Sequence, residues 1–243
     1  MRLEPWVAAA GDLLLGSACH GCGRPWWGVC PACRDRLRAL RPYLTRPEPC
    51  PDGFPPTATC SPYDDLVRGL VIAHKERSAL GLGPVLADRL AQSVHALLGP
   101  GTAGLPVVLV PVPSAAAAVR RRGYDATATL ARLTARQLAS RHRVRAVSLL
   151  AQRGGVADQA GLDAAARGRN LAGGLRVRRP AKVAGLVAAG SVAVLVDDLV
   201  TTGSSLAEAA RVLRRAGLPL VGAATVAATV RRSAEGSPHL SIP

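Results

Sequence analysis

The sequence has few aromatic residues, almost no lysine and no long apolar run. Aromatic residues make up 3% of its 243 positions, which argues against a protein that recognises nucleic acid by stacking bases on aromatic side chains. No apolar stretch reaches the roughly 18 residues of a membrane-spanning helix. The hydrophobic fraction, 49%, is too high and the charged fraction, 19%, too low for a disordered chain. We therefore expect a folded protein with one substantial core.

Basic residues outnumber acidic residues by 31 to 16, and all of the basic residues except Lys75 and Lys182 are arginines. The resulting net charge of +15 attracts phosphate-bearing ligands and nucleic acid. The chain is also rich in alanine and glycine, so a compositional bias of the whole genome explains the arginine excess equally well. If the positive charge does serve to bind nucleic acid, the arginine clusters at 141–145 and 176–179 are candidates for contact with single-stranded DNA.

The N-terminus resembles a secretion signal only superficially. Arg2 precedes an apolar run over 6–15, but Glu4 offsets the positive charge and Asp12 interrupts the run. We therefore predict a short amphipathic helix over 5–15 and a cytoplasmic protein.

Four of the six cysteines form two pairs, each with two residues between its members. A tight turn with this spacing lets both thiolates reach one ion, and two such turns supply the four-sulfur shell that Zn²⁺ prefers. Gly21 and Gly23 suit the positive φ angles of such turns. Two disulfides, a redox CxxC motif and an iron–sulfur cluster are the alternatives, and His20 is expected to be a spectator. The predicted ligands of a structural zinc ion are Cys19, Cys22, Cys30 and Cys33.

A proline-rich stretch separates the cysteine pairs from the rest of the chain. We predict an N-terminal helix and zinc module over 1–45, a proline-rich linker over 46–60, and a main domain over 61–243. Cys50 and Cys60 lie in the linker and are interpreted as ordinary small residues.

The most informative segment is a strand, a polar loop and a helix near the C-terminus. Residues 192–196 form an uninterrupted apolar run, as in a central parallel strand that is buried on both faces. Two aspartates follow, then a loop of glycine and hydroxyl residues, and then an amphipathic helix over 206–216. The loop lacks a Gly-Lys-[Ser/Thr] sequence, so it is not a Walker loop. Its residues are Thr201, Thr202, Gly203, Ser204 and Ser205.

This arrangement suits a ribose 5-phosphate group. In a parallel α/β sheet, ligands bind where a loop leaves the carboxyl end of a strand, and the unpaired N–H groups of a helix N-terminus bind phosphate. Asp197 and Asp198 repel an anion, but they accept hydrogen bonds from sugar hydroxyls, with Mg²⁺ alongside. The alternative is a pair of solvent-exposed aspartates before a helix cap.

Residues 194–205 resemble the phosphoribosyl pyrophosphate (PRPP) signature of type I phosphoribosyltransferases. With the four cysteines, they make the chain similar to the ComF/GntX-like family, which is tied to competence for DNA uptake in some bacteria. The segments 63–75, 111–124 and 153–170 resemble further motifs of that family. The departures from the family pattern are Asp125-Ala126 in place of Asn-Gln, Ser205 in place of Thr, and Gly173-Gly174-Leu175 in place of Gly-Ala-Phe.

The resemblance implies an α/β fold with a type I phosphoribosyltransferase-like, mainly parallel sheet flanked by helices, and with the small zinc module at the N-terminus. It also implies a flexible hood over 152–179 that excludes water from the site. The implied catalytic residues are Asp197, Asp198 and Arg153, and the implied hood residues are Gln159, Arg167 and Asn170. The implied PRPP-binding residues are Lys75, Pro113, Ser114, Arg121, Arg122, Asp197, Asp198, Thr201, Thr202, Gly203, Ser204 and Ser205.

Two functions from different classes follow from this resemblance. The first is Mg²⁺-dependent transfer of the phosphoribosyl group of PRPP to an unknown nitrogen acceptor, with release of pyrophosphate. The second is a non-catalytic PRPP-binding sensor or scaffold that contacts single-stranded DNA or competence proteins through the zinc module and the arginine clusters. Release of pyrophosphate discriminates the two. The sequence predicts neither the acceptor nor the oligomeric state.

Overall fold

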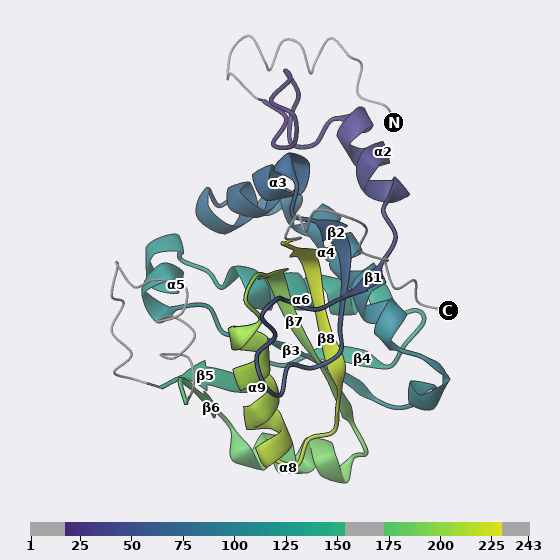
Figure 1. Ribbon diagram of the computed structural model, residues 1–243, viewed down its shortest axis with the longest axis vertical. Helices are drawn as coiled ribbons and strands as arrows, with labels where there is room; N and C mark the ends of the chain where they lie inside the picture. The colour runs from purple at the N-terminus through teal and green to yellow at the C-terminus, as the bar shows by residue number, and fades with distance from the viewer. Residues whose placement is uncertain (1–17, 154–172, 230–243) are drawn as a thin grey trace.

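The computed structural model describes residues 18–153 and 173–229, which form a mostly parallel sheet with helices on both faces (Figure 1). Six strands lie in the order β1-β2-β8-β7-β3-β4. β1 is antiparallel to β2, and every other neighbouring pair in this sheet is parallel. The predicted fold class is therefore confirmed. The strands are β1 (Tyr43–Thr45), β2 (Thr57–Pro62), β3 (Val107–Pro111), β4 (Val144–Ala146), β7 (Val192–Val200) and β8 (Leu220–Ala228), with β5 (Leu150–Gln152) and β6 (Leu175–Val177) as a separate antiparallel pair.

The central strands are buried on both faces because their apolar residues alternate between two layers. Along β3, Val107 and Leu109 belong to one apolar cluster, whereas Val108 belongs to the other. Successive side chains of a strand point to opposite faces of the sheet, so this division follows from strand geometry. β7 is buried in the same way but ends at Val200 rather than at residue 196. It runs that far because β8 pairs with it up to Val200.

Two layers of helices cover the sheet (Figure 1). α3, α4 and α6 contribute to one apolar cluster, and α8 and α9 contribute to the other. None of the helices in the described part of the chain has both the length and the apolarity needed to cross a bilayer. The predicted helix over 5–15 lies outside the described residues. The helices are α2 (Pro31–Ala39), α3 (Asp65–Glu76), α4 (Gly83–Leu97), α5 (Ala116–Arg122), α6 (Ala126–Leu138), α8 (Pro180–Ala188) and α9 (Ser204–Arg215), with short 3₁₀ turns at Leu80–Leu82 and Pro100–Thr102.

The first cysteine turn packs on α3 through two glycines. A Cβ added to Gly69 of α3 would overlap the carbonyl oxygen of His20, and one added to Gly21 would overlap Cδ1 of Leu66. Because neither space admits a side chain, the backbone of the turn lies directly against the helix. Both glycines of this turn are expected to have a positive φ. Gly23 does, with a φ of +73°, whereas Gly21 does not and instead allows the close contact with Leu66.

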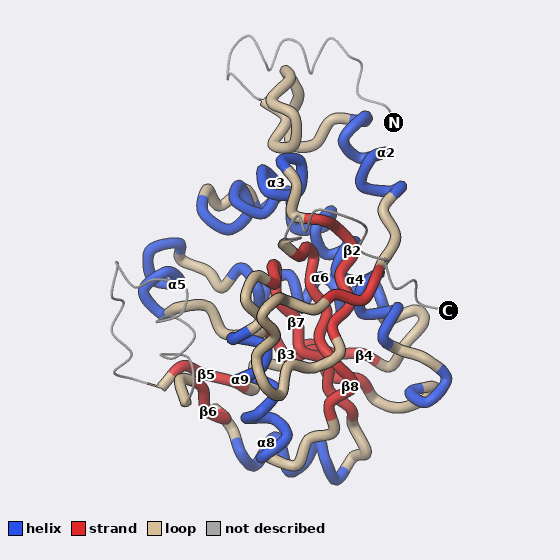
Figure 2. The backbone as a smooth tube through the Cα atoms, in the orientation of Figure 1, coloured by secondary structure: helices blue, strands red, loops and turns tan. Residues whose placement is uncertain are grey.

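The sheet begins earlier in the chain than the predicted domain boundary at residue 61. β1 lies within the segment assigned to the zinc module, and β2 begins at Thr57 within the predicted linker. The polar residues of β2 are typical of a loop, but they are buried here because β1 and β8 pair with the strand on either side. What remains of the linker is the connection between β1 and β2 at 46–56, drawn as a tan tube in Figure 2.

Candidate functional site

The two aspartates of the predicted phosphate motif lie near the end of β7, and the loop leads directly into α9. Asp198 is 4% exposed and Asp197 is half-buried. Thr201 and Thr202 are exposed, and the hydroxyl of Thr202 lies 3.2 Å from that of Ser204 at the start of α9. A buried carboxylate therefore lies beside a hydroxyl-rich helix N-terminus that is open to a ligand.

Lys75 of α3 forms an ion pair with Asp198. Its Nζ lies 2.9 Å from one carboxylate oxygen of Asp198 and 3.1 Å from the other. Burial disfavours the charge on Lys75, but the attraction of Asp198 and Asp197 outweighs it and raises the pKa of Lys75. The lysine therefore stays protonated at neutral pH and offsets part of the charge of the two aspartates.

The backbone N–H of Asp198 donates to the carboxylate of Asp197 over 2.9 Å. Burial, followed by the charge of the neighbouring Asp198, raises the pKa of Asp197 well above its ordinary value, and the positive charge of Lys75 opposes this only in part. The two carboxylates thus share one nearby cation. Groups that donate hydrogen bonds, such as sugar hydroxyls, relieve their repulsion without adding negative charge.

Arg122, one of the predicted pyrophosphate ligands, is engaged with the end of α3. Its side chain is 4% exposed, its Nη1 donates to the carbonyl of Lys75 over 2.8 Å, and it lies 3.4 Å from the carboxylate of Glu76. Tyr124 donates its hydroxyl proton to the carbonyl of His74. Arg121 differs, because its side chain is 68% exposed and lies 3.5 Å from Glu76. Arg122 and Tyr124 therefore hold the turn that carries Lys75, and Arg121 is the exposed candidate for a phosphate.

The loop after β3 lies at the same edge of the sheet as the loop after β7. β3 and β7 are parallel neighbours, with Pro111 opposite Val196. Ser114 donates its hydroxyl proton to Asp125 over 3.1 Å, and the same carboxylate oxygen accepts from the backbone N–H of Ala128. The aspartate that departs from the family pattern is therefore the N-cap of α6 and also orients Ser114. Pro113 and Ser114 are half-buried.

The described ends of the predicted hood form the β5–β6 hairpin. The N–H of Arg153 donates to the carbonyl of Gly174 over 2.8 Å. Glu208 of α9, which is 5% exposed, accepts from the N–H of Gly173 over 3.1 Å and from that of Leu175 over 3.4 Å. Sequence reasoning missed Glu208, because its role depends on backbone groups far away in the chain. The implied hood residues Gln159, Arg167 and Asn170 lie outside the described residues.

The four predicted metal ligands come together in one cluster. Their Sγ atoms all lie within 4.8 Å of one another, and those of Cys22 and Cys30 are 3.7 Å apart. A tetrahedral Zn²⁺ with Zn–S bonds of about 2.3 Å places its sulfur atoms about 3.8 Å apart, so these cysteines fit the ion. Among the described residues, no other group of three His, Cys, Asp or Glu side chains has the spacing for a metal ion. The described cysteines form no disulfide.

The backbone of the cysteine turns favours a thiolate at Cys19. Burial opposes the charge, but the N–H groups of Cys30, Cys22 and Gly21 point at its sulfur and lower the pKa of Cys19 to about 6. Burial and the neighbouring cysteine sulfurs raise the pKa of Cys33 instead. Four thiolates repel one another without a cation, so a dication is the natural partner of this cluster.

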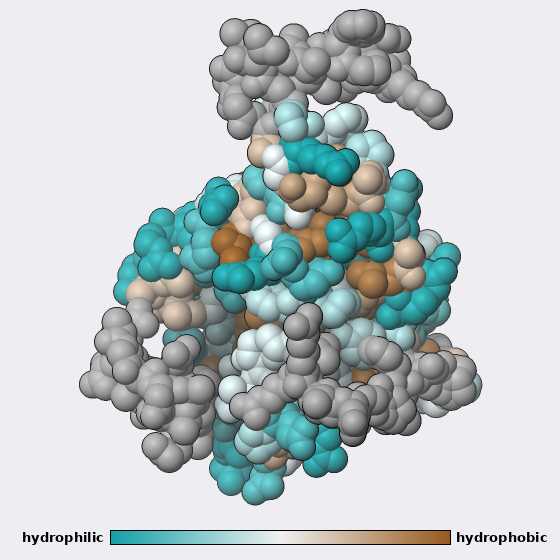
Figure 3. All heavy atoms as spheres, turned by 45° about the horizontal axis from the view of Figure 1, so that its top comes forward, coloured by the Kyte–Doolittle hydropathy of each residue, from teal (hydrophilic) through white to brown (hydrophobic). Residues whose placement is uncertain are grey.

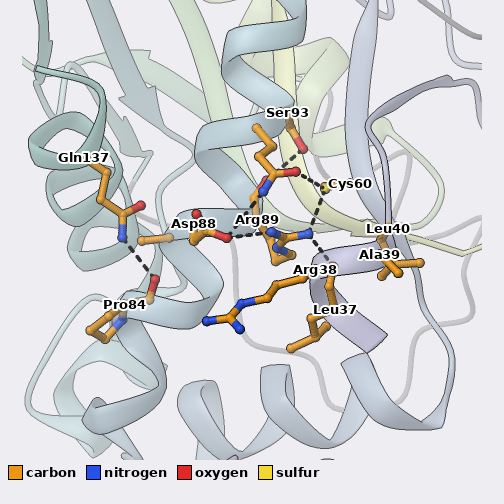
Figure 4. Close-up of polar contacts among 12 residues, drawn as sticks. Leu37, Arg38, Ala39, Leu40, Cys60, Pro84, Asp88, Arg89, Ser93 and Gln137 are labelled. Atoms are coloured by element: carbon orange, nitrogen blue, oxygen red, sulfur yellow. Dashed lines mark hydrogen bonds and ion pairs between the residues drawn. The ribbon is translucent and has the colours of Figure 1, made fainter. Parts of the chain in front are cut away.

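A buried arginine outside both sites fastens α2 to α4 (Figure 4). Arg89 of α4 is 2% exposed, donates to the carbonyl of Leu37 at the end of α2, and lies 2.6 Å from the carboxylate of Asp88 and 3.6 Å from Sγ of Cys60. Burial raises the pKa of the Cys60 thiol.

A pocket of about 1530 Å³ lies between α4, the end of α6 and β1, lined among others by Tyr43, His95 and Arg141. On the face of the described part that Figure 3 shows, hydrophilic residues lie between scattered apolar patches. Thr201 and Thr202 of the β7–α9 loop are exposed, so the loop presents polar groups to a ligand.

A comparison with known families gives a match over the C-terminal part of the chain. Residues 129–239 match the family model of the phosphoribosyl transferase domain. The match includes the β5–β6 hairpin, the β7–α9 loop and β8, and it begins after Lys75 and the four cysteines. No protein in a search of curated proteins matched the chain. This match supports a function of the phosphoribosyl-transfer type and is consistent with PRPP as a ligand.

Proposed function

We propose that the protein binds PRPP together with Mg²⁺ at the β7–α9 loop and transfers its phosphoribosyl group to a nitrogen acceptor. The observation that carries this proposal is the pair Asp197 and Asp198, with its lysine partner, directly before a hydroxyl-rich loop at the N-terminus of a helix. A ribose needs acceptors for its hydroxyls and a 5′-phosphate needs N–H and O–H donors. The loop offers both kinds of group side by side.

The 5′-phosphate binds to the start of α9 in this proposal. Gly203 has a φ of +74° and precedes the first residue of the helix, and the helix has no side-chain cap at its N-terminus. The backbone N–H groups of its first turn and the hydroxyls of Ser204 and Ser205 are therefore available as donors to an anion. The positive end of the helix dipole adds to the attraction.

The ribose hydroxyls bind to the aspartate pair. Both carboxylate oxygens of Asp198 contact the ammonium group of Lys75, and one oxygen of Asp197 accepts from a backbone N–H. These carboxylates therefore have little room for several direct bonds to Mg²⁺, which prefers near-octahedral oxygen coordination. We infer that Asp197 and Asp198 would accept hydrogen bonds from the ribose hydroxyls rather than coordinate Mg²⁺ directly, and that Mg²⁺ would be held mainly by the ligand's own phosphate oxygens.

The reaction replaces one bond at C1 of the ribose by another. A nitrogen lone pair forms the new C1–N bond, the C1–O bond breaks, and pyrophosphate leaves with the bonding electrons. Mg²⁺ supplies positive charge to the leaving group when it is bound. Of this chain's own residues, the exposed Arg121 lies on α5, which follows the loop after β3, and is the candidate to stabilise the leaving group.

PRPP with Mg²⁺ is expected to raise the melting temperature of the protein. A ligand that binds only the folded state at about 100 times its Kd adds about 2.7 kcal/mol, which corresponds to about 5–10 °C for a chain of this size. Differential scanning fluorimetry with PRPP, with and without Mg²⁺, measures the shift. Release of pyrophosphate with candidate nitrogen bases then separates a transferase from a binding protein. An unchanged melting temperature at millimolar PRPP and Mg²⁺ would contradict the proposal.

The finer assignment is to a ComF-like protein of the cytoplasm with a link to DNA uptake. The four cysteine thiols support the zinc module that distinguishes this family among phosphoribosyltransferase-like proteins. Reduced cysteines also suit a reducing compartment. Competence proteins are the corresponding candidate partners.

The second candidate function is a non-catalytic PRPP sensor or scaffold that contacts single-stranded DNA. Two observations favour it. Trp27, in the cysteine module, is 69% exposed, and one exposed tryptophan suffices to stack a base. Arg141, Arg143 and Arg145 are all exposed along and before the edge strand β4. They supply the phosphate contacts in this alternative.

Replacing Arg141, Arg143 and Arg145 together with alanine is expected to weaken binding of single-stranded DNA. Each phosphate contact contributes about −0.7 to the slope of log K against log salt, so the slope falls by about 2 in magnitude. Fluorescence anisotropy between about 50 and 200 mM salt measures it. The matched control replaces Arg132, Arg136 and Arg215, which are also exposed and lie in neither arginine cluster. Equal effects of the two triple variants would show that only net charge matters and would remove the β4 surface from the proposal.

A further inference from the structure

Residues 46–56, which we name the strap, lie along α9 although the sequence predicts a linker there. The strap connects β1 to β2, and its flanking residues Thr45 and Thr57 are opposite each other in the ladder. In Figures 1 and 2 the strap passes beside α9. Because both of its ends are held by the sheet, it is a closed loop against this helix rather than a free spacer.

The strap touches the phosphate loop at Gly203, the residue that precedes α9. A Cβ added to Gly203 would lie 2.7 Å from Cε2 of Phe54 and 2.8 Å from Cγ of Pro47, so no other residue fits there without displacing the strap. Gly203 also has a φ of +74°, which side chains rarely adopt. The glycine thus meets two demands at once, a positive φ and a close contact with the strap.

A second contact fixes the strap at the opposite end of α9. Nη1 of Arg214, in the last turn of the helix, donates to the carbonyl of Gly53 over 2.7 Å. The half-buried ring of Phe54 also packs against the apolar cluster that contains the buried side of α9. The strap therefore spans the helix from its N-cap to its last turn.

The strap covers only one side of the phosphate loop. Gly203 is buried, whereas Thr201 and Thr202 next to it are exposed and Ser204 and Ser205 are half-buried. A strap that obstructed the site would bury these hydroxyls. The exposed hydroxyls indicate that the strap supports the loop from behind and leaves the ligand side open.

We propose that Phe54 and Pro47 are positioning residues, which hold Gly203 and the first turn of α9 in the conformation that binds the phosphate. This inference rests on the proposed function. Backbone N–H groups bind an anion well only when they already point at it, because a loop that must first become ordered loses affinity. Gly203 has no side chain to anchor itself, so the anchor comes from the strap. The strap, which precedes the family match over 129–239, thereby supports a loop that lies within it.

Four variants test the strap. Phe54→Ala removes the ring that contacts Gly203, and Phe54→Leu keeps an apolar side chain there. Arg214→Ala removes the hydrogen bond to Gly53. Because Arg214 is exposed, this variant can replace Phe54→Ala in the test if Phe54→Ala does not fold. Arg215→Ala is the matched control, because it removes the same charge from the neighbouring exposed position of the same helix. The two readouts are amide hydrogen exchange at Ala207, whose N–H donates to the carbonyl of Gly203, without ligand, and the Kd of PRPP with Mg²⁺ by titration calorimetry.

We expect Phe54→Ala to speed exchange at Ala207 by about tenfold, because the carbonyl of Gly203 that its N–H contacts is no longer held in place. We also expect the variant to weaken PRPP binding by at least about tenfold, as displacement of a binding group does. Phe54→Leu is expected to keep both the exchange rate and the Kd of PRPP close to those of the parent protein. Arg214→Ala weakens binding about two- to tenfold, the effect of one hydrogen bond, and Arg215→Ala leaves both readouts as in the parent. Unchanged exchange and unchanged Kd in Phe54→Ala and Arg214→Ala overturn the inference. A parent protein that does not bind PRPP overturns the proposed function instead, and the exchange data then decide on their own whether the strap holds the loop.

Discussion

Asp198→Asn is expected to weaken binding of PRPP with Mg²⁺ by about 10- to 150-fold. Hydrogen bonds to charged groups contribute about 1.5–3 kcal/mol each, and the ribose loses a charged acceptor in a position that is 4% exposed. The variant also removes the partner of Lys75, whose ammonium lies within 3.1 Å of both carboxylate oxygens. Titration calorimetry on the parent and the variant measures the loss directly.

Three further variants separate the ribose contact from the ion pair. Lys75→Met removes the cation and leaves Asp198 in place, and the double variant Lys75→Met with Asp198→Asn closes a thermodynamic cycle. Asp35→Asn is the control, because this aspartate is exposed and forms only a surface ion pair with Arg38. If Asp198→Asn binds PRPP like the parent, or if Asp35→Asn weakens binding equally, Asp198 does not hold the ribose.

The second large effect is expected when a predicted zinc ligand is replaced. Cys22→Ser is expected to reduce the metal content from about one equivalent to near zero and to unfold the cysteine module, because a structural zinc site contributes about 10–16 kcal/mol in small zinc domains. The expected consequence extends to α3, since Gly69 of that helix contacts the backbone of His20 directly. Because α3 also carries Lys75, PRPP binding should weaken when the metal is lost.

Elemental analysis of freshly purified protein, combined with a thermal melt, checks the zinc prediction. Cys50→Ser is the matched control, because Cys50 is half-buried and lies outside the cluster. The control should keep its metal and its melting temperature. Less than half an equivalent of metal in the parent, or full metal content in Cys22→Ser, would contradict the assignment of the four cysteines.

The parts of the fold that the sequence predicts are those with a local pattern. The apolar run at 192–196, the hydroxyl loop and the amphipathic helix after it follow one another directly, and all three are found where expected. The spacing of the cysteines likewise predicts a cluster, because each pair lies within one turn. Periodicity and motif spacing report such arrangements well because the groups that interact are neighbours in the chain.

The contacts that complete the site have no local signature. Lys75 meets Asp198 across 123 positions of sequence, and Arg122 reaches the carbonyl of Lys75 across 47. From the sequence, Arg122 is predicted to bind phosphate, because arginines after a strand are typical phosphate ligands. In the fold, its guanidinium donates to the carbonyl of Lys75 at the end of α3. Phe54 lies in a proline-rich stretch that resembles a linker, and only the pairing of β1 with β2 brings it to Gly203.

The central claim, that the loop after β7 binds the ribose 5-phosphate part of PRPP, is tested most directly by a crystal structure of the protein with PRPP and Mg²⁺. The account predicts the 5′-phosphate within hydrogen-bonding distance of the backbone N–H groups at Gly203–Ser205. It also predicts the ribose hydroxyls on Asp197 and Asp198. A ligand bound elsewhere, such as in the pocket between α4, the end of α6 and β1, with the loop after β7 left free, would contradict the account.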